Sequence, residues 1–362
     1  MADRTDRPIE PGLSIFLDLV RISAALIVML AHAQVSGLIA LNLGLLEMAP
    51  VAVIVFFVLS GYIIESTTAK PAGLGQYVIR RTARVYSVVL PALVLSFGLS
   101  GGYAASQGSV DFAAFVKDWG QWWRLPVVLT FQAEDWFASV EVPWNGPFWS
   151  MSYEIAYYAL YAVLTFFSGR RRVVAATLVC LLAGPRILLL LPCWWIGVEL
   201  ARRPQVQYPS RAMAWVGLAL SSGLVVGLSI ASLPGRISYY LAKVLPGMSL
   251  LAHSREFAAD YLFAILVVAM IAAARQLQFG PNSWLVRCGK PITWAAGYTF
   301  SIYLFHRPLQ QLASQFYQYQ HGDQVKALLL SVIILLVVIA LGSVTERRTS
   351  AWRRAIATMA RR

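Results

Sequence analysis

The sequence has little charge. Asp, Glu, Lys and Arg together account for 13% of the 362 residues, whereas a soluble domain has about 25%. Hydrophobic residues reach 58%. Segments such as 212–230 and 326–342 are apolar on every side of a helix and so lack the polar face of a helix at a water interface. Because about twenty such residues cross the hydrocarbon core of a bilayer, the sequence predicts an all-α, polytopic transmembrane bundle.

The signatures of several soluble enzyme classes are also missing. The sequence contains no HExxH, no Cys/His zinc spacing, no P-loop, no GxSxG and no GxGxxG that leads from a strand into a helix. Its three cysteines, Cys180, Cys193 and Cys288, have neither metal-ligand nor CxxC spacing. We therefore expect neither a metal site nor a permanently bound cofactor.

No basic stripe or arm accompanies the net charge of +13, since the basic residues stand in short clusters between apolar segments. This pattern is typical of membrane topology signals and argues against nucleic acid as a partner. The N-terminal segment 1–12 is polar and partly acidic, and no small-residue cleavage site follows the first apolar stretch. We therefore expect 13–33 to be a retained first span.

Ten helices are predicted as candidate spans. They lie at about 13–33, 41–64, 85–105, 148–168, 173–185, 187–201, 212–231, 258–274, 298–316 and 326–344. The fifth and sixth are divided by Gly184, Pro185 and Arg186, so they are either two short spans or one kinked or re-entrant element. Nine spans or eight remain possible.

Lys and Arg residues predict the orientation, because short loops rich in them stay cytoplasmic. With the N-terminus inside, every second loop is basic, and so is the C-terminal tail. These basic residues are Lys70, Arg80, Arg81, Arg84, Arg170, Arg171, Arg172, Arg202, Arg203, Arg211, Arg275, Arg287, Lys290, Arg347, Arg348, Arg353, Arg354, Arg361 and Arg362. We therefore expect both termini to be cytoplasmic, one membrane domain over 1–345 and a basic tail over 346–362.

The longest predicted outer loop, about 106–147, is acidic and rich in tryptophan. Its indoles fit either a belt at the lipid headgroups or a surface that stacks on sugars, and both interpretations stay open. They are Trp119, Trp122, Trp123, Trp136 and Trp144.

Ionisable side chains within a span are costly in lipid, and the first span contains three: Asp18, Arg21 and His32. Eleven residues separate Arg21 from His32, which is roughly three helical turns plus 20°, so both project from one stripe about 16 Å apart along the axis. The predicted topology puts Arg21 in the cytoplasmic half and His32 near the outer end. In a purely structural interpretation, Arg21 pairs with Asp18 one turn away and His32 hydrogen-bonds a neighbouring helix.

Two further features lie toward the predicted cytoplasmic side. Ser60 and Gly61 interrupt the apolar run of the second span, and a glycine there permits close approach of a helix or a ligand. Arg80, Arg81 and Arg84 share one helical face, which suits bidentate phosphate binding and equally suits anchoring at the inner surface.

Two later spans carry polar groups at membrane depth. The fourth opens with Trp149 and Ser150 and places Glu154 at a depth comparable with that of His32. The ninth holds Tyr303, His306 and a proline, Pro308, that frees a backbone carbonyl.

In this order, these segments resemble the motifs of acyltransferase family 3, integral membrane acyltransferases of bacterial type. The resemblance runs from Phe16–Arg21 with His32, through Phe56–Tyr62 and Arg80-Arg81-x-x-Arg84, to Trp149–Glu154 and Ser301–Pro308. It implies a ten-span fold, an acyl-CoA donor used from the cytoplasmic side, and transfer to a hydroxyl. It also implies that Arg21 and His32 form the functional core. One departure is visible, since the family often has a proline soon after the last arginine of the cluster and here Pro91 comes later.

Taken with these residues, the resemblance implies a membrane-embedded O-acyltransferase of the bacterial plasma (inner) membrane. Acyl-CoA, with an acetyl group in the first instance, is expected at Arg80, Arg81, Arg84, Ser60 and Gly61. His32 is expected to act as the base on a glycan or other surface acceptor, assisted by Arg21 and Glu154. Asp18, Trp149, Ser150, Tyr303 and His306 are further candidates. A transporter or flippase for glycans or lipid-linked sugars is the alternative, and the acceptor, acyl chain, oligomeric state and a covalent intermediate stay open.

Overall fold

The computed structural model describes residues 9–41, 43–68, 72–121, 123–203 and 208–359. It is 82% helix, and no strand occurs in these ranges. The predicted all-α fold is thus confirmed. Four of the residues discussed above lie outside the described ranges: Lys70, Trp122, Arg361 and Arg362.

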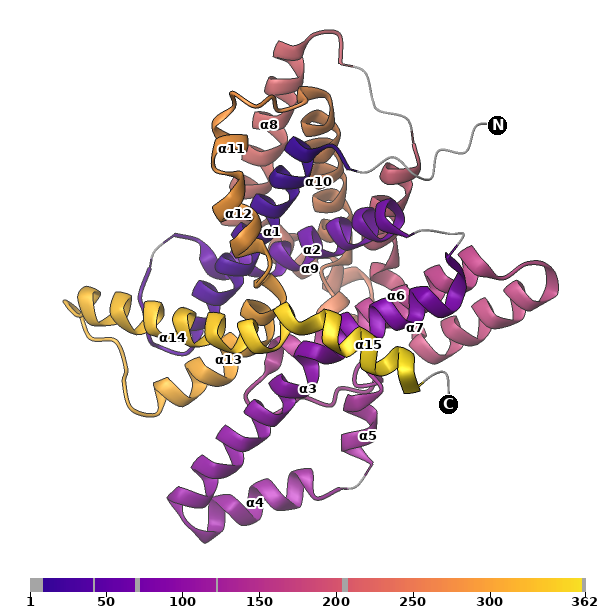
Figure 1. Cartoon of the computed structure of the whole chain (residues 1–362). Helices are drawn as coiled ribbons and strands as arrows, with labels where there is room; N and C mark the ends of the chain where they lie inside the picture. Colours follow the sequence, from indigo (N-terminus) through magenta and orange to yellow (C-terminus); the bar gives the residue numbers. More distant parts are fainter. Residues whose placement is uncertain (1–8, 42, 69–71, 122, 204–207, 360–362) are drawn as a thin grey trace. The chain divides into compact units, whose positions relative to one another are not determined.

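Among the described residues, seven helical stretches are long and apolar enough to cross a membrane, and Figure 1 labels the helices in them. They comprise α1 (Pro11–Val35), α2 (Leu45–Thr67), α3 (Gly73–Gln107), α7 (Gly169–Arg202), α8 (Arg211–Ile230), Met248–Leu277 with α10 (Phe257–Leu277), and Gln324–Met359 with α14 (Gln324–Val344). The predicted spans at 148–168 and 298–316 are helices too, α6 (Trp149–Phe166) and α13 (Thr299–Ser314). They are not among the seven stretches, because α13 has only 16 residues and α6 is rich in serine and tyrosine.

The fifth and sixth predicted helices are the two halves of α7, which breaks at Gly184. The backbone of this residue has φ 75° and ψ 179°, a conformation that only glycine adopts readily. Pro185 follows and has no N–H, so the Leu181 carbonyl loses its helical donor. The Trp136 indole N–H fills this place and donates to Leu181 O at 2.7 Å.

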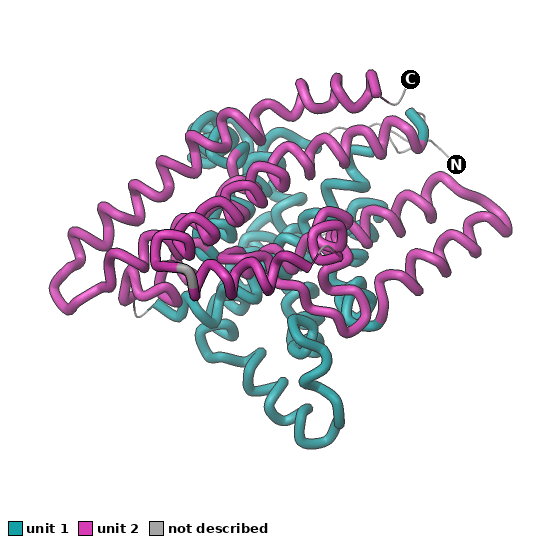
Figure 2. Tube along the Cα trace, turned by 90° about the horizontal axis from the view of Figure 1, so that it is seen from below, with its two compact units in different colours: residues 1–28, 42–73, 185–297 teal, residues 29–41, 74–184, 298–362 magenta. Residues whose placement is uncertain are grey.

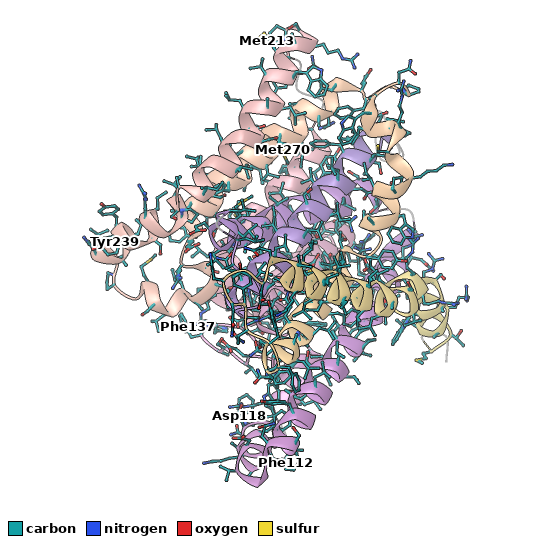
Figure 3. All side chains as sticks on the ribbon, turned by 90° about the vertical axis from the view of Figure 1, so that its left-hand side faces the viewer. Phe112, Asp118, Phe137, Met213, Tyr239 and Met270 are labelled. Atoms are coloured by element: carbon teal, nitrogen blue, oxygen red, sulfur yellow. The ribbon has the colours of Figure 1, made fainter. Side chains whose placement is uncertain are left out.

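Shorter helices lie between the long ones, and α15 follows the last of them. They are α4 (Ser109–Trp119), α5 (Arg124–Leu129), α9 (Leu233–Val244), α11 (Trp284–Arg287), α12 (Gly289–Ala296), α15 (Thr349–Met359) and the 3₁₀ turns η2 (Gly146–Phe148), η3 (Met248–Ser254) and η4 (Glu346–Arg348). The predicted outer loop 106–147 therefore contains α4 and α5. Phe112 and Asp118 of α4 lie together at the end of the arm formed by α3 and α4 (Figure 3).

The described chain forms two compact units (Figure 2). Unit 1 comprises residues 1–28, 42–73 and 185–297, and unit 2 comprises 29–41, 74–184 and 298–362. The single membrane domain expected from the sequence stays a prediction.

Within unit 1, α10 packs against α8 and α2, and α2 meets the second half of α7 backbone to backbone. A Cβ atom on Gly61 would collide with the Trp194 carbonyl oxygen, and one on Gly197 would collide with the Val58 carbonyl oxygen. Because neither glycine has room for a side chain, the two helices approach more closely than larger residues would allow.

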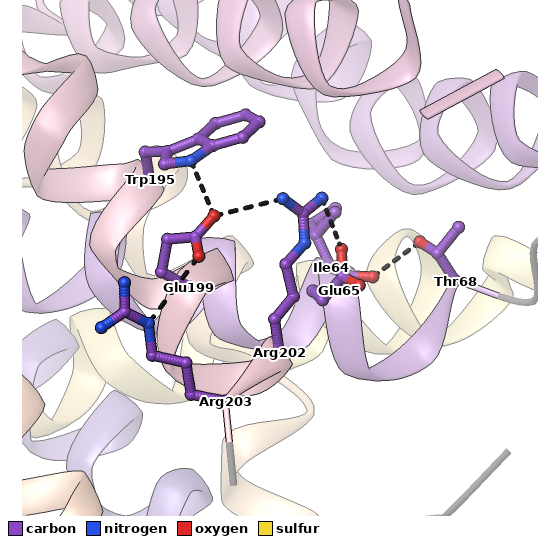
Figure 4. Close-up of polar contacts among 7 residues, drawn as sticks. All are labelled: Ile64, Glu65, Thr68, Trp195, Glu199, Arg202 and Arg203. Carbon is purple, nitrogen blue, oxygen red and sulfur yellow. Dashed lines mark hydrogen bonds and ion pairs between the residues drawn. The ribbon is translucent and has the colours of Figure 1, made fainter. Parts of the chain in front are cut away.

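An ion-pair network joins the ends of the same two helices (Figure 4). Arg202 lies 3.1 Å from Glu65 on α2 and 3.2 Å from Glu199 on α7. The Trp195 indole N–H donates to Glu199 at 3.1 Å. One arginine of the predicted cytoplasmic loops therefore has a structural role in addition to any effect on topology.

Candidate active site

The first span is the continuous helix α1, which carries both Arg21 and His32. Arg21 Nη1 lies 3.5 Å from Asp18 Oδ1, and their side chains are 18% and 16% exposed. This ion pair is the one that the purely structural interpretation of the sequence expected. Such a pair keeps the guanidinium compensated near the membrane interior.

His32 meets the second intramembrane histidine. His306 Nε2 lies 3.1 Å from His32 Nδ1, and His306 Nδ1 lies 2.7 Å from the Ile302 carbonyl oxygen. A carbonyl only accepts, so His306 Nδ1 carries the proton, and Nε2 of this fully buried, neutral ring is an acceptor. His32 Nδ1 is then the donor, which leaves the lone pair of His32 on Nε2. The pair therefore fixes one tautomer of His32.

Three other contacts hold α13 against the end of α1. The Gln310 amide donates to the Met29 carbonyl at 2.8 Å, Arg307 donates to Ser36 Oγ, and the Tyr319 N–H donates to the Gly37 carbonyl at 2.7 Å. They lie on both sides of the histidine pair along the chain. These three contacts help the hydrogen bond between the two histidines to keep the two segments together.

The opening turn of α6 forms a second polar group in unit 2. Ser150 Oγ lies 2.8 Å from the Tyr303 hydroxyl, which donates to the Pro147 carbonyl at 3.1 Å. Glu154 accepts from the Tyr158 hydroxyl one turn away, and it interacts electrostatically with Tyr303. Trp149 packs edge-on against Tyr153, with ring centroids 5.1 Å apart. The two motifs that the sequence placed in different spans thus meet through Ser150 and Tyr303.

Asn145, which the sequence did not single out, joins α13 to α3. Its side chain is fully buried, and Nδ2 donates at 3.1 Å to both Ser96 Oγ and the Leu304 carbonyl. Pro308 lies four residues after Leu304 and cannot donate to that carbonyl. Asn145 supplies the missing donor, so the Leu304 carbonyl keeps a hydrogen bond without any water molecule.

The first turn of α13 rests on the C-terminal segment. Glu346 Oε2 accepts from the Ser301 N–H at 2.8 Å, where a carboxylate also complements the helix dipole. Gly342 of α14 packs so closely that a Cβ atom would lie 2.7 Å from Tyr298 Cδ1 and 2.8 Å from Ser301 Oγ. Sequence reasoning assigned Glu346 to a basic tail, and its only signal was a lone acid ahead of a run of arginines.

The arginine cluster lies in the first turns of α3. Arg80 is exposed and Arg84 half-buried, while the Arg81 guanidinium lies over the Tyr77 ring at 5.7 Å. The Tyr77 hydroxyl donates to the Tyr158 carbonyl at 3.1 Å and so ties the cluster to α6. Pro91, the displaced proline of the motif, lies inside α3 without ending it.

Of the predicted site residues, Asp18, Arg21, Ser60 and Gly61 belong to unit 1, and the others belong to unit 2. Gly61 is occupied by the contact with α7, which is the helix-packing use of a glycine. Within the units, the structure brings together Arg21 with Asp18, His32 with His306, and Ser150 with Tyr303.

Seven long apolar helices define a multi-pass membrane protein, and the pair of His32 on α1 with His306 on α13 is its candidate catalytic centre. A family model described as an acyltransferase domain matches residues 14–347. The chain therefore belongs to this family of acyltransferases, acyltransferase family 3, as the motifs predicted. No curated protein and no solved structure matches the chain.

Proposed function

We propose that this membrane acyltransferase moves an acyl group, acetyl in the first instance, from acyl-CoA to a hydroxyl of a glycan at the bacterial plasma membrane. The observation that supports this most directly is the hydrogen bond from His32 to His306, because it leaves the lone pair of His32 on Nε2. A neutral imidazole held in one tautomer is a suitable general base near pH 7.

The reaction needs a base that takes the proton of the acceptor hydroxyl and later gives it to the leaving thiolate. His32 Nε2 takes the proton of the acceptor hydroxyl as its oxygen attacks the thioester carbonyl carbon. The tetrahedral intermediate then collapses, the C–S bond breaks, and the thiolate of CoA recovers the proton from the imidazolium. His306 Nε2 accepts from His32 Nδ1 throughout, so it stabilises the imidazolium between the two proton transfers.

The arginine cluster is the proposed site for the phosphates of the donor. Guanidinium groups bind phosphate in a bidentate manner, and Arg80 is exposed for such a contact. The stacking of Arg81 on Tyr77 gives its planar group a fixed orientation. Arg21 is the proposed guide for the pantetheine arm toward His32, along the stripe the two residues share on α1.

Purified protein in lipid nanodiscs, given radiolabelled acetyl-CoA and glycans from the bacterial surface, tests the proposal. We expect wild-type protein to release CoA and to label the glycan, and His32→Ala to lose at least about a hundredfold in kcat. His321→Ala is the matched control, because His321 is exposed and outside the helices. Full CoA release by His32→Ala would overturn the assignment of the base, and failure of wild-type protein to bind acetyl-CoA would favour a transporter.

The donor site has its own control. Arg80→Ala and Arg84→Ala should raise KM for acetyl-CoA several-fold and leave kcat little changed, since phosphate binding is uniform through the reaction. Arg171→Ala changes an exposed arginine at the start of α7, and it should leave KM unchanged. An equal rise in KM for Arg171→Ala would mean that the effect is general charge attraction and not a site.

A further inference from the structure

Three aromatic rings from separate parts of unit 2 meet at one corner. Tyr103 lies in the last turns of α3, and its ring centroid is 5.7 Å from that of Trp144 and 6.3 Å from that of Phe316. The Tyr103 and Phe316 rings stand at 89° to each other, and Phe316 is 78% exposed. We call these three residues the aromatic corner. It presents ring faces in two directions instead of one flat apolar surface.

Hydrogen bonds connect the aromatic corner to both helices that carry the histidine pair. Trp144 immediately precedes Asn145, which donates to the Leu304 carbonyl two residues before His306. The segment that follows Phe316 is bonded to the end of α1, since Gln318 Nε2 donates to the Ser36 carbonyl at 3.3 Å. The segments that carry the corner are therefore bonded to the segments that carry the two histidines.

The corner and the arginine cluster lie at opposite ends of the same helix. Nineteen residues of α3 separate Arg84 from Tyr103, which at 1.5 Å per residue is roughly 28 Å. This is close to the thickness of a hydrocarbon core, about 30 Å. If the arginines hold the donor at one membrane surface, the aromatic corner faces the other.

The chain around Phe316 is polar, and the two charged side chains that act on the adjacent Tyr317, Asp323 and Lys326, pair with each other at 3.1 Å. Residues 308–320 contain no Asp, Glu, Lys or Arg, and three glutamines next to Phe316 are exposed: Gln315, Gln318 and Gln320. Amides both donate and accept, which matches the paired hydroxyls of a sugar, while the C–H groups of one pyranose face pack on the negative face of an aromatic ring. A lipid anchor would instead combine apolar side chains with unpaired lysine or arginine, whereas Lys326 pairs with Asp323.

Trp144 is held in a conformation that costs energy. Its φ of 55° lies in the left-handed region, which is a genuine outlier for a bulky residue and is typical of functional sites. The structure thus keeps this indole beside Tyr103 against the preference of its own backbone.

We propose that the aromatic corner binds one pyranose ring of the acceptor, stacked against Phe316 and Trp144. This inference rests on the proposed function, in which the acceptor is a glycan. The inference also places sugar binding at the end of α3 that carries Tyr103.

Saturation-transfer difference NMR tests this with full-length protein in nanodiscs and a mixture of methyl glycosides of glucose, galactose, mannose, rhamnose and N-acetylglucosamine. We expect transfer to the ring protons of one face of at least one glycoside. Phe316→Tyr keeps an aromatic face and should keep the transfer, whereas Phe316→Leu keeps only the apolar character and should reduce it at least fivefold. Phe112→Leu is the matched control, an exposed phenylalanine on α4 of the same unit.

The outcomes separate this inference from the proposed function. Transfer that is equal in Phe316→Leu and wild-type protein is what a lipid anchor gives, and it would overturn the inference, as would transfer to none of the glycosides. Neither of these two NMR results bears on CoA release, which the wild-type acyltransferase should still show. Loss of CoA release in wild-type protein would instead contradict the proposed function, whatever the sugars do.

Discussion

Asn145 donates a hydrogen bond to the carbonyl of Leu304 at 3.1 Å, the group that Pro308 deprives of its helical donor. In a membrane interior no water replaces a lost donor. Asn145→Ala should therefore lower the free energy of unfolding by roughly 1–3 kcal/mol. Pro308→Ala restores a backbone N–H for Leu304, so the same asparagine substitution should cost less in that background. A double-mutant cycle on thermal midpoints in detergent measures this coupling, and additive costs would contradict it.

His306 should act on catalysis through His32. His306→Ala removes the acceptor of His32 Nδ1, and we expect kcat to fall about ten- to a hundredfold, with KM for acetyl-CoA little changed. His306→Gln places an amide oxygen near the former Nε2 and should recover part of kcat. A purely structural role for His306 would lower the thermal midpoint of both variants alike and would not produce this recovery.

Gly61 gives a test of close helix packing in unit 1. A methyl group there would collide with the Trp194 carbonyl oxygen, so Gly61→Ala should destabilise the protein by roughly 1–3 kcal/mol. Gly98→Ala is the control, because Gly98 lies in α3 with nothing within 4 Å of its Cβ position. The comparison is made by thermal melting of the two purified variants. Equal melting temperatures would mean that α2 and α7 separate easily enough to admit a side chain.

Asp135, in the loop between α5 and η2, should make the stability of that loop depend on pH. Burial raises the pKa of its carboxyl from 3.8 to about 6. Between these two pH values the carboxyl is protonated in the folded chain and ionised in the unfolded chain. This stability is fully present below about pH 4 and disappears as the pH rises to about 6. Asp135→Asn should therefore raise the thermal midpoint at pH 7.5 and have little effect at pH 4. The exposed Asp111 on α4 provides the control as Asp111→Asn, which should show no such difference.

The features set by local sequence were predictable. The apolar run of α1 and the ionisable residues within it followed from composition and helical periodicity, and the Asp18–Arg21 pair followed from their spacing of three residues. The break in α7 followed from Gly184 and Pro185, which mark a turn in any context. In each case the partners are neighbours along the chain.

The contacts between distant segments were not predictable in the same way. Periodicity shows which face of a helix a residue occupies but not which helix it meets, so the pairing of His32 with His306, 274 residues apart, needed the structure. Asn145 was missed because its surroundings resemble an ordinary turn, and only the position of Leu304 in space reveals its partner. The proline in α13 did indicate a freed carbonyl, but not the donor that satisfies it.

Two carbonyls of unit 2, one in α7 and one in α13, lose their helical donor to a proline and are satisfied by one piece of chain, residues 136–145. Trp136 donates to Leu181, which Pro185 leaves without a donor, and Asn145 does the same for Leu304. This piece precedes both helices in the sequence, so it is synthesised before either of them. The carbonyl of Leu304 is made 159 residues after Asn145, and α13 can complete its hydrogen bonding only against a segment already in place. Assembly of the histidine pair is then a late event in biogenesis, and a chain truncated before α13 has the donor for Leu304 but no means of holding the tautomer of His32.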